Sequence, residues 1–246
     1  MNNESKERSV KQLPVWLLAG LLMAFLVQVL HQYISISSVG SEFQQLPQPY
    51  SVNTYQALSQ GSEKLWSYLL LLKVQLHDNQ RGRHENYQHL DYKILSEWLL
   101  TLGELNKSSD YAAFLASRVY SQIKDKEKIR MMIDVIDKMF ELQPEIHWKR
   151  MTEACLLAKH ELRDLPLALN LADKVARLPG TIKIPYWARD MKIILLDELD
   201  QLQSAQILIS SMLESGSIRD GDEVRFLKHR LLKIQQKMLN DGQVGK

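Results

Sequence analysis

Apolar and polar positions follow the period of an α-helix over most of the chain after residue 62. Apolar residues recur three and four positions apart, which places them on one face of a helix, and no segment shows the two-residue alternation of a half-buried strand. The pattern predicts helices joined by short connections, so that consecutive helices are antiparallel neighbours. The predicted helices cover 62–77, 91–105, 110–123, 126–143, 145–162, 165–178, 185–199, 201–215 and 222–239.

The N-terminal part carries a long apolar segment. Between Pro14 and Leu30 the only polar side chain is that of Gln28. A bilayer core of about 30 Å takes roughly 17–25 helical residues, so the sequence predicts a single transmembrane helix from Pro14 to Ile36. Trp16 and Tyr33 lie near its two ends, where amphipathic rings favour the headgroup layer.

Basic residues predict the orientation of this segment. Lys6, Arg8 and Lys11 precede it, and the next basic residue of the Lys or Arg type is Lys64. The positive-inside rule then makes residues 1–13 a cytoplasmic tail and puts the C-terminal part on the other side, which in a bacterium is the periplasm. A cleaved signal peptide is the alternative, but the apolar run exceeds the usual length of about 7–15 residues. We expect a linker over 37–61, a helical domain over 62–240 and a disordered tail over 241–246.

The predicted helices repeat at a nearly constant spacing. Leu95, Met132, Ala168 and Ala205 are 37, 36 and 37 residues apart, and the positions three before, four after and seven after each of them are apolar or aromatic. One amphipathic helix alone gives such a face, whereas four in phase indicate an internal repeat of helix pairs.

This spacing resembles the tetratricopeptide repeat, a helix–turn–helix unit of about 34 residues. The closest stretch is RDLPLALNLADKVARLPG over 163–180, and KIRMMIDVIDKMFELQP ends in Pro144 at the family's closing proline. The family's first-helix Trp, Leu-Gly and Tyr pattern is not present in register, and a non-repeating helix bundle is the alternative. The resemblance implies an all-α fold, with the transmembrane helix followed by an α-solenoid of antiparallel helix hairpins that the helix 222–239 caps.

Composition excludes several classes of function. Basic and acidic residues number 31 and 29, whereas a nucleic-acid binder that acts by displacing counterions needs a basic excess. The single cysteine, Cys155, rules out an internal disulfide and any multi-cysteine metal site. It lies in an apolar helical stretch and is expected to be a buried small hydrophobe. We expect no cofactor.

A metal site is a weak candidate around His77, His84 and His89. His84 and His89 are five residues apart, whereas a zincin motif needs histidines four apart on one helix face. The polar residues 78–88 are typical of a solvated loop. A metal-dependent hydrolase that uses these three histidines is therefore a remote alternative function.

In a solenoid of the family that the chain resembles, the first helix of each hairpin lines a concave groove. Register places the following residues in a partner-binding groove: Arg150, Glu153, His160, Trp187, Asp190 and Asp197, after a preceding set of Phe114, Ser117 and Ser121. The groove is expected to bind an extended or helical peptide. The sequence thus predicts a non-enzymatic scaffold or adaptor, anchored in the inner membrane by a single helix, for assembly, export or maturation of an envelope complex. A cofactor-free integral subunit of a membrane enzyme complex is the alternative.

Overall fold

The computed structural model describes residues 15–38, 45–78, 86–215, 218 and 220–244. These residues form helices and their connections and contain no β-strand, so the all-α prediction is confirmed. The chain divides into two compact units, Met1–Gln44 and Gln45–Lys246. The predicted cytoplasmic tail over 1–13 lies outside the described residues.

The first unit contains the helix α1 (Val15–Ser38). Its described side chains, from Trp16 to His31, are all exposed, and most of them are large and apolar. Within the described part of the chain, no helix meets both the length and the apolar character that crossing a membrane requires. The transmembrane helix over residues 14–36 therefore stays a prediction.

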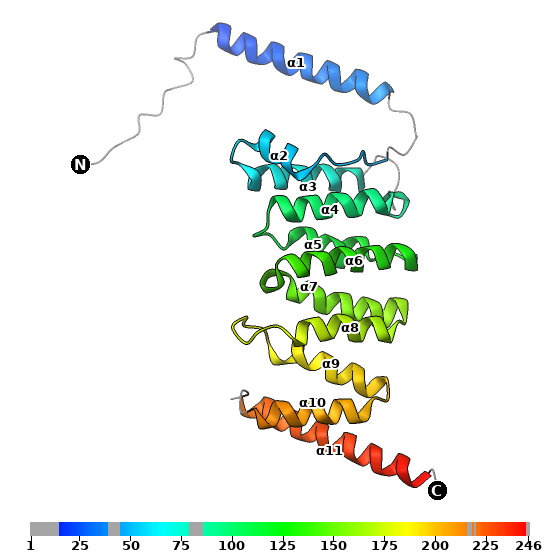
Figure 1. The fold of residues 1–246 in the computed structure, drawn as a ribbon. Coiled ribbons are helices and arrows are strands. Elements are labelled where there is room, and N and C mark those ends of the chain that lie inside the picture. The colour runs from blue at the N-terminus through cyan, green and yellow to red at the C-terminus, as the bar shows by residue number, and fades with distance from the viewer. Residues whose placement is uncertain (1–14, 39–44, 79–85, 216–217, 219, 245–246) are drawn as a thin grey trace, which may run out of the picture. The chain divides into compact units, whose positions relative to one another are not determined.

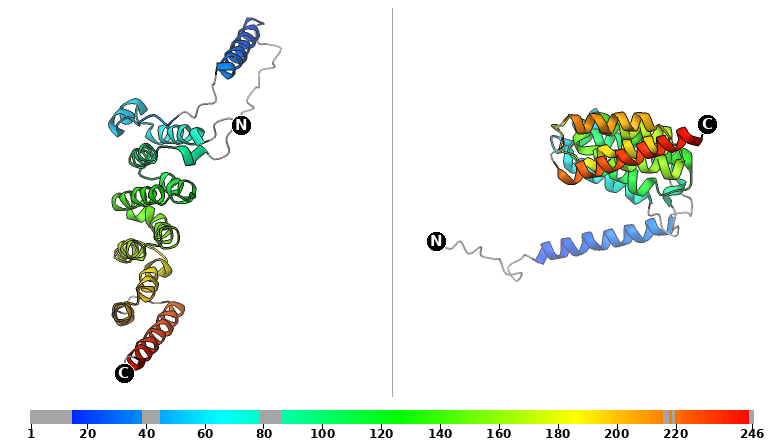
Figure 2. Two further views of the ribbon diagram at one scale, coloured as in Figure 1. Left: turned by 90° about the vertical axis from the view of Figure 1, so that its right-hand side faces the viewer. Right: turned by 90° about the horizontal axis from the view of Figure 1, so that it is seen from below.

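The second unit is a succession of helices that follow one another in chain order from one end of the unit to the other (Figures 1 and 2). Each helix packs mainly against its neighbours in sequence, because the connections are short. The helices are α2 (Val52–Ser59), α3 (Glu63–Asp78), α4 (Tyr92–Leu105), α5 (Tyr111–Leu115), α6 (Lys126–Leu142), α7 (Pro144–Leu157), α8 (Leu165–Ala176), α9 (Tyr186–Glu198), α10 (Leu202–Glu214) and α11 (Gly221–Val244).

Three shorter helical segments accompany these helices in the described part of the unit. The 3₁₀-helix η2 (Asn86–His89) precedes α4, and the π-helical segments η3 (Ala116–Tyr120) and η4 (Ala158–Leu162) continue α5 and α7. The predicted helices 110–123 and 145–162 are thus each an α-helix whose last part widens into a π-helix, a change that apolar periodicity does not reveal.

Local chemistry explains several helix starts. Asp125 caps α6, and its Oδ1 accepts hydrogen bonds from the backbone N–H groups of Glu127 and Lys128 at 3.0 and 3.2 Å. Asp91 and Asp164 cap α4 and α8 in the same way. A side-chain oxygen at this position satisfies backbone donors that have no partner inside the helix, which is worth about 1 kcal/mol.

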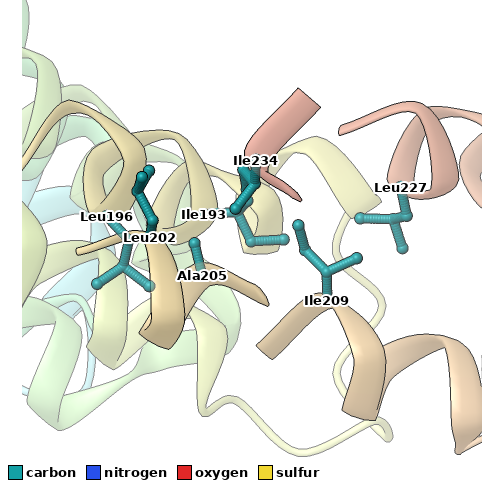
Figure 3. Packing of buried hydrophobic residues seen from close by; sticks show 7 residues of the cluster. All are labelled: Ile193, Leu196, Leu202, Ala205, Ile209, Leu227 and Ile234. Atoms are coloured by element: carbon teal, nitrogen blue, oxygen red, sulfur yellow. The ribbon is translucent and has the colours of Figure 1, made fainter. Parts of the chain in front are cut away.

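The predicted core positions are buried. The side chains of Leu95, Met132, Ala168 and Ala205, which align at the repeat spacing, are each 0% exposed. At the C-terminal end, leucine and isoleucine side chains of α9, α10 and α11 form one apolar cluster with Ala205 (Figure 3). This cluster comprises Ile193, Leu196, Leu202, Ala205, Ile209, Leu227 and Ile234, so α11 is packed onto the unit by apolar contacts rather than attached only by charge.

The region expected to be a linker over 37–61 contributes to the second unit from Gln45 onward. Leu46 and Tyr55 are buried, and Tyr55 lies against Trp98 of α4 with the ring centroids 6.0 Å apart. The indole Nε1 of Trp98 donates a hydrogen bond to the carbonyl oxygen of Pro47 at 2.6 Å. Within α2 the buried residues are Tyr55 and Ser59, and one buried apolar side chain is too few to produce a periodic apolar pattern, so the sequence did not indicate this helix.

The other end of the unit also differs from expectation. The helix α11 continues to Val244, so residues 241–244 of the expected disordered tail are helical. Residues 245–246 of that tail lie outside the described part of the chain.

Candidate functional site

A cluster of charged and polar side chains lies between the helix formed by α5 and η3 and the neighbouring helix α7. Its core is Arg150, which is only 9% exposed, with His147 and Glu153 from the same helix at 4% and 8%. Asp110, just before α5, and Ser117 and Arg118 of η3 contact these side chains. We call these six residues the Arg150 cluster.

Arg150 joins two carboxylates at the centre of this cluster. Its Nε donates to Oδ2 of Asp110 at 2.7 Å, and its Nη1 donates to both carboxylate oxygens of Glu153 at 2.8 and 2.7 Å. Nδ1 of His147 lies 3.0 Å from the other oxygen of Asp110. Hydrogen bonds between ionised partners are stronger than neutral ones, and the planar guanidinium suits such paired contacts. Arg150 therefore fixes the start of α5 against α7.

Glu153 accepts two further hydrogen bonds from side chains of η3. Ser117 Oγ donates to its Oε2 and Arg118 Nη2 donates to its Oε1, each at 2.7 Å. Burial alone would raise the pKa of Glu153, but the hydrogen bonds from Arg118, Ser117 and Arg150 outweigh burial and hold that pKa below its usual value. Burial likewise opposes the charge of Arg150, yet Asp110 and Glu153 raise its pKa. Both groups are therefore ionised at neutral pH.

An open pocket of about 510 Å³ lies beside the Arg150 cluster. Tyr111 and Phe114 of α5 stack with their ring centroids 5.7 Å apart, and the guanidinium of Arg150 lies 5.1 Å from the centroid of Phe114. The remaining lining residues come from α3 and from the connection before α5: Tyr68, Ser108, Ser109 and Asp110. Aromatic walls with a few fixed polar groups are typical of sites that bind an apolar or aromatic group and orient it.

The structure brings together only some of the residues predicted for the groove. Arg150 and Glu153 meet in the Arg150 cluster, together with Ser117 and beside Phe114 of the preceding set. His160 is exposed in η4. Trp187 is 52% exposed on α9, and its ring centroid lies 6.0 Å from that of Trp148 on α7.

The two predicted acidic residues of α9 are both engaged with α11. Asp197 forms an ion pair with Arg230 at 2.8 Å and lies 3.5 Å from Nζ of Lys237. Asp190 is 2% exposed and is hydrogen-bonded to Glu223, another acid. Burial, then the hydrogen bond and the charge of Glu223, raises the pKa of Asp190 to about 8. These side chains attach α11 to the unit, a role that the spacing along α9 could not reveal.

The predicted metal-binding histidines do not form a described site. His77 lies in α3, where its Nδ1 is 2.9 Å from the carbonyl oxygen of Lys73, and His89 is exposed in η2. His84 lies outside the described residues. Among the residues that the structure describes, no group of three or more potential metal ligands is close enough to hold an ion.

The prediction that Cys155 is buried is confirmed, because its side chain is 1% exposed within α7. Burial raises the pKa of its thiol to about 12, so the reactive thiolate is scarcely populated at neutral pH.

Asp110 and Tyr111 are functional candidates that the sequence left unidentified, whereas Phe114 of the pocket was among the predicted groove residues. Asp110 occupies the N-cap position of α5, but its side chain forms no capping hydrogen bond and instead binds His147 and Arg150. These partners lie 37 and 40 residues further along the chain, close to the repeat spacing. That spacing was the signal in the sequence that could have indicated the contacts of Asp110. Comparisons of the chain with protein-family models, curated proteins and solved structures found no match.

Proposed function

We propose that the protein is a non-enzymatic, protein-binding scaffold that recognises a peptide segment of its partner in the pocket between α3, α5 and α7. The observation that carries this proposal is the stacked pair Tyr111 and Phe114 beside the buried ion pairs of Arg150. Because these ion pairs hold the polar side chains of the pocket in place before a ligand binds, little conformational entropy is lost when a ligand enters. An apolar or aromatic side chain of the partner would lie against Tyr111, which is 40% exposed.

A tetratricopeptide-like solenoid is part of the same proposal. Support comes from polar contacts between helices, several of which recur at a separation of 36 or 37 residues along the chain. Ser117 contacts Glu153 at a separation of 36 residues, Asp137 contacts Lys174 at 37, and Gln75 contacts Tyr111 at 36. In a solenoid, each unit contacts the equivalent positions of the next, so a constant separation is expected.

We also propose that α1 anchors the protein in the inner membrane, with the helical unit on the periplasmic side. The support is chemical: α1 exposes large apolar side chains around its surface, among them Leu21, Phe25 and Leu30, and burying them in lipid would remove apolar surface from water. The basic residues before this helix favour a cytoplasmic N-terminus. Alkaline extraction of membranes tests the anchoring, since a protein that is only peripherally bound is released.

The pocket is tested by photo-crosslinking in cells with a crosslinking phenylalanine analogue in place of Tyr111. We expect one or a few discrete crosslinked proteins, and we expect Phe114→Ala in the same chain to weaken the crosslinks. A crosslinker in place of Ile207, which is 69% exposed on α10, is the matched control for non-specific contact. If positions 111 and 207 capture the same proteins, or if Tyr111→Ala leaves partner binding unchanged, the pocket is not the binding site.

Purification of the full chain in mild detergent separates the adaptor from the alternative of a permanent subunit. Partners recovered in substoichiometric amounts that depend on Tyr111 indicate reversible binding. A partner recovered at a fixed ratio that Tyr111→Ala does not alter indicates an integral subunit instead.

A further inference from the structure

The helix α3 exposes a row of leucines along one face, which we call the leucine row. The opposite face is packed against the rest of the unit, where Val74 and Leu71 are 0% and 3% exposed. The members of the leucine row are Leu65 at 59%, Leu69 at 54%, Leu72 at 53% and Leu76 at 62% exposed. Single exposed leucines are common on protein surfaces, whereas a contiguous apolar surface is typical of an interaction site.

The residues beside the leucine row combine aromatic rings and lysines. Successive residues of a helix are about 100° apart, so the four leucines fall within about 60° of one another. Tyr68 and Lys64 then lie along one edge of the row, and Trp66 and Lys73 lie along the other. Both lysines are exposed, and Nζ of Lys73 lies 5.4 Å from the centroid of the Trp98 ring. An apolar stripe bordered by aromatic rings and lysines is typical of a helix that lies in the interface of a membrane.

Acidic residues are scarce at this end of the unit. α2 and α3 form the end remote from α11 (Figure 1). Between Gln45 and His77 the chain contains one acidic residue, Glu63. α11 also exposes apolar side chains, but exposed lysines such as Lys228 and Lys233 lie among them. The end formed by α2 and α3 can therefore approach lipid phosphate groups with little repulsion and little loss of carboxylate hydration.

The connection from α1 limits the distance between the second unit and a membrane that holds α1. The helix α1 ends at Ser38, and the second unit begins at Gln45. Gln45 is fixed to that unit, because its Nε2 donates to the carbonyl oxygen of His89 at 3.2 Å and its Oε1 accepts from the N–H of Asp91 at 3.3 Å. The peptide bonds from residue 38 to residue 45 span at most about 25 Å in any conformation. A connection this short gives the second unit a high effective concentration at the membrane surface, so that even a weak contact is formed.

We propose that the leucine row of α3 binds the surface of the membrane that holds α1, an inference that rests on the anchoring proposed for α1. The leucines enter the boundary between the lipid headgroups and the acyl chains, where interfacial helices bury their apolar face about 5–10 Å deep. The helix α3 is then a second and reversible attachment of the chain to the membrane. This attachment does not depend on a peptide binding beside Arg150.

Quenching by lipids tests this contact in the full chain, reconstituted into vesicles at a low ratio of protein to lipid. A fluorophore is attached to a cysteine in place of Leu72, and nitroxide groups are placed on the lipid either near the headgroup or near the end of the acyl chain. The native Cys155 can stay, because it is 1% exposed and its buried thiol does not compete for the label. We expect the nitroxides near the headgroup to quench this label and iodide in the water to quench it weakly. The matched control is a label in place of Ile207 on α10, which is 69% exposed and which iodide alone should quench.

Glutamate substitutions test whether the leucine row itself makes the contact. Leu65→Glu together with Leu69→Glu, in the chain labelled at position 72, should weaken membrane binding of α3 at least about tenfold, because the loss of one buried leucine alone has an effect of about that size. The matched control is Leu232→Glu together with Leu239→Glu on α11, whose leucines are 58% and 68% exposed, and it should leave the quenching unchanged. Lipid quenching that survives the substitutions at positions 65 and 69 would overturn the proposal.

A label in place of Ala24, in the middle of α1, separates this inference from the anchoring on which it rests. If nitroxides near the end of the acyl chain quench position 24 while iodide alone quenches position 72, the anchor stands and the leucine row faces water, which overturns the inference. A label at position 72 that neither iodide nor lipid quenches shows that protein, such as a second copy, covers the row, and this also overturns it. Lipid quenching at neither position overturns the anchoring and the inference together. Lipid quenching at position 72 alone refutes the anchor but supports the membrane contact of α3.

Discussion

The contact between Asp190 and Glu223 should make the attachment of α11 dependent on pH. Asp190 on α9 is 2% exposed, and one of its carboxylate oxygens has no hydrogen-bond partner. Among the described residues, its ionisable partner is Glu223 rather than a cation. Several charged groups near α9 are engaged in ion pairs of their own: Lys159 with Glu198, Lys192 and Arg177 with Asp173, Lys174 with Asp137, and Arg230 with Asp197.

The direction of the effect follows from proton binding. The pKa of Asp190 is raised from 3.8 to about 8 in the folded protein, first by burial and then by Glu223. Between these two values the folded chain holds a proton that the unfolded chain has released, so the free energy of unfolding falls as the pH rises. Full stability is present below about pH 4 for this pair and is lost as the pH passes through about 8.

The magnitude has an upper bound of about 1.4 kcal/mol per pH unit, since one proton is involved. From pH 5 to pH 7 the local stability of α11 should therefore fall by up to about 2.7 kcal/mol, or about a hundredfold in its opening equilibrium. Replacing Asp190 with asparagine removes the ionisable group while keeping its shape, and the amide can donate a hydrogen bond to Glu223. We expect Asp190→Asn to abolish this slope and to stabilise α11 at pH 7 and above.

Amide hydrogen exchange of residues 221–240 in the full chain measures this local opening directly. Exchange is followed from pH 5 to pH 8 and corrected for the intrinsic pH dependence of amide exchange. The control is Asp197→Asn, which removes the ion pairs with Arg230 and Lys237 and should raise the opening of α11 while leaving the slope intact. Equal slopes in the unaltered chain and in Asp190→Asn would refute the reasoning.

Two further predictions concern the interior of the second unit. Arg150→Met leaves the carboxylates of Asp110 and Glu153 without their shared cation, and it should reduce the free energy of unfolding by about 3–5 kcal/mol. Chemical denaturation followed by circular dichroism measures this free energy. A loss below about 1 kcal/mol would contradict the assigned contacts. Trp98→Phe removes the hydrogen bond to the carbonyl oxygen of Pro47. We expect the free energy of unfolding to fall by about 1 kcal/mol and proteolysis near residues 45–50 to become faster. Unchanged cleavage there would show that this hydrogen bond does not hold the segment in place.

Local signals in the sequence account for much of the fold. The apolar faces around Leu95 and Met132 predicted the helices α4 and α6 to within one residue at each end, because helical periodicity and caps act within a few residues. The sequence pattern did not predict the helix α2. Its buried Tyr55 packs against Trp98, which is 43 residues away in the sequence. A contact at that distance produces no periodic pattern inside an eight-residue helix.

The candidate site was predicted less completely than the fold. Register identified Arg150 and Glu153 as neighbours on one helix, but it treated them as groove residues open to a partner. In the fold they are buried and bind Asp110, Ser117 and Arg118 of the preceding helical segment. The sequence could not separate these two outcomes, because a charged side chain has the same spacing whether it faces solvent or a neighbouring helix.

The amino-acid sequence by itself determined that the chain is helical, where most helices begin and end, and which apolar face each one buries. These properties depend on residues three or four positions apart. Only the tertiary structure decided which polar groups meet: Asp110 with Arg150, and Asp190 with Glu223. It also placed Tyr111 in the wall of the pocket beside Arg150. Such pairings join residues that are tens of positions apart, and their ionisation depends on burial, which exists only once the helices have packed.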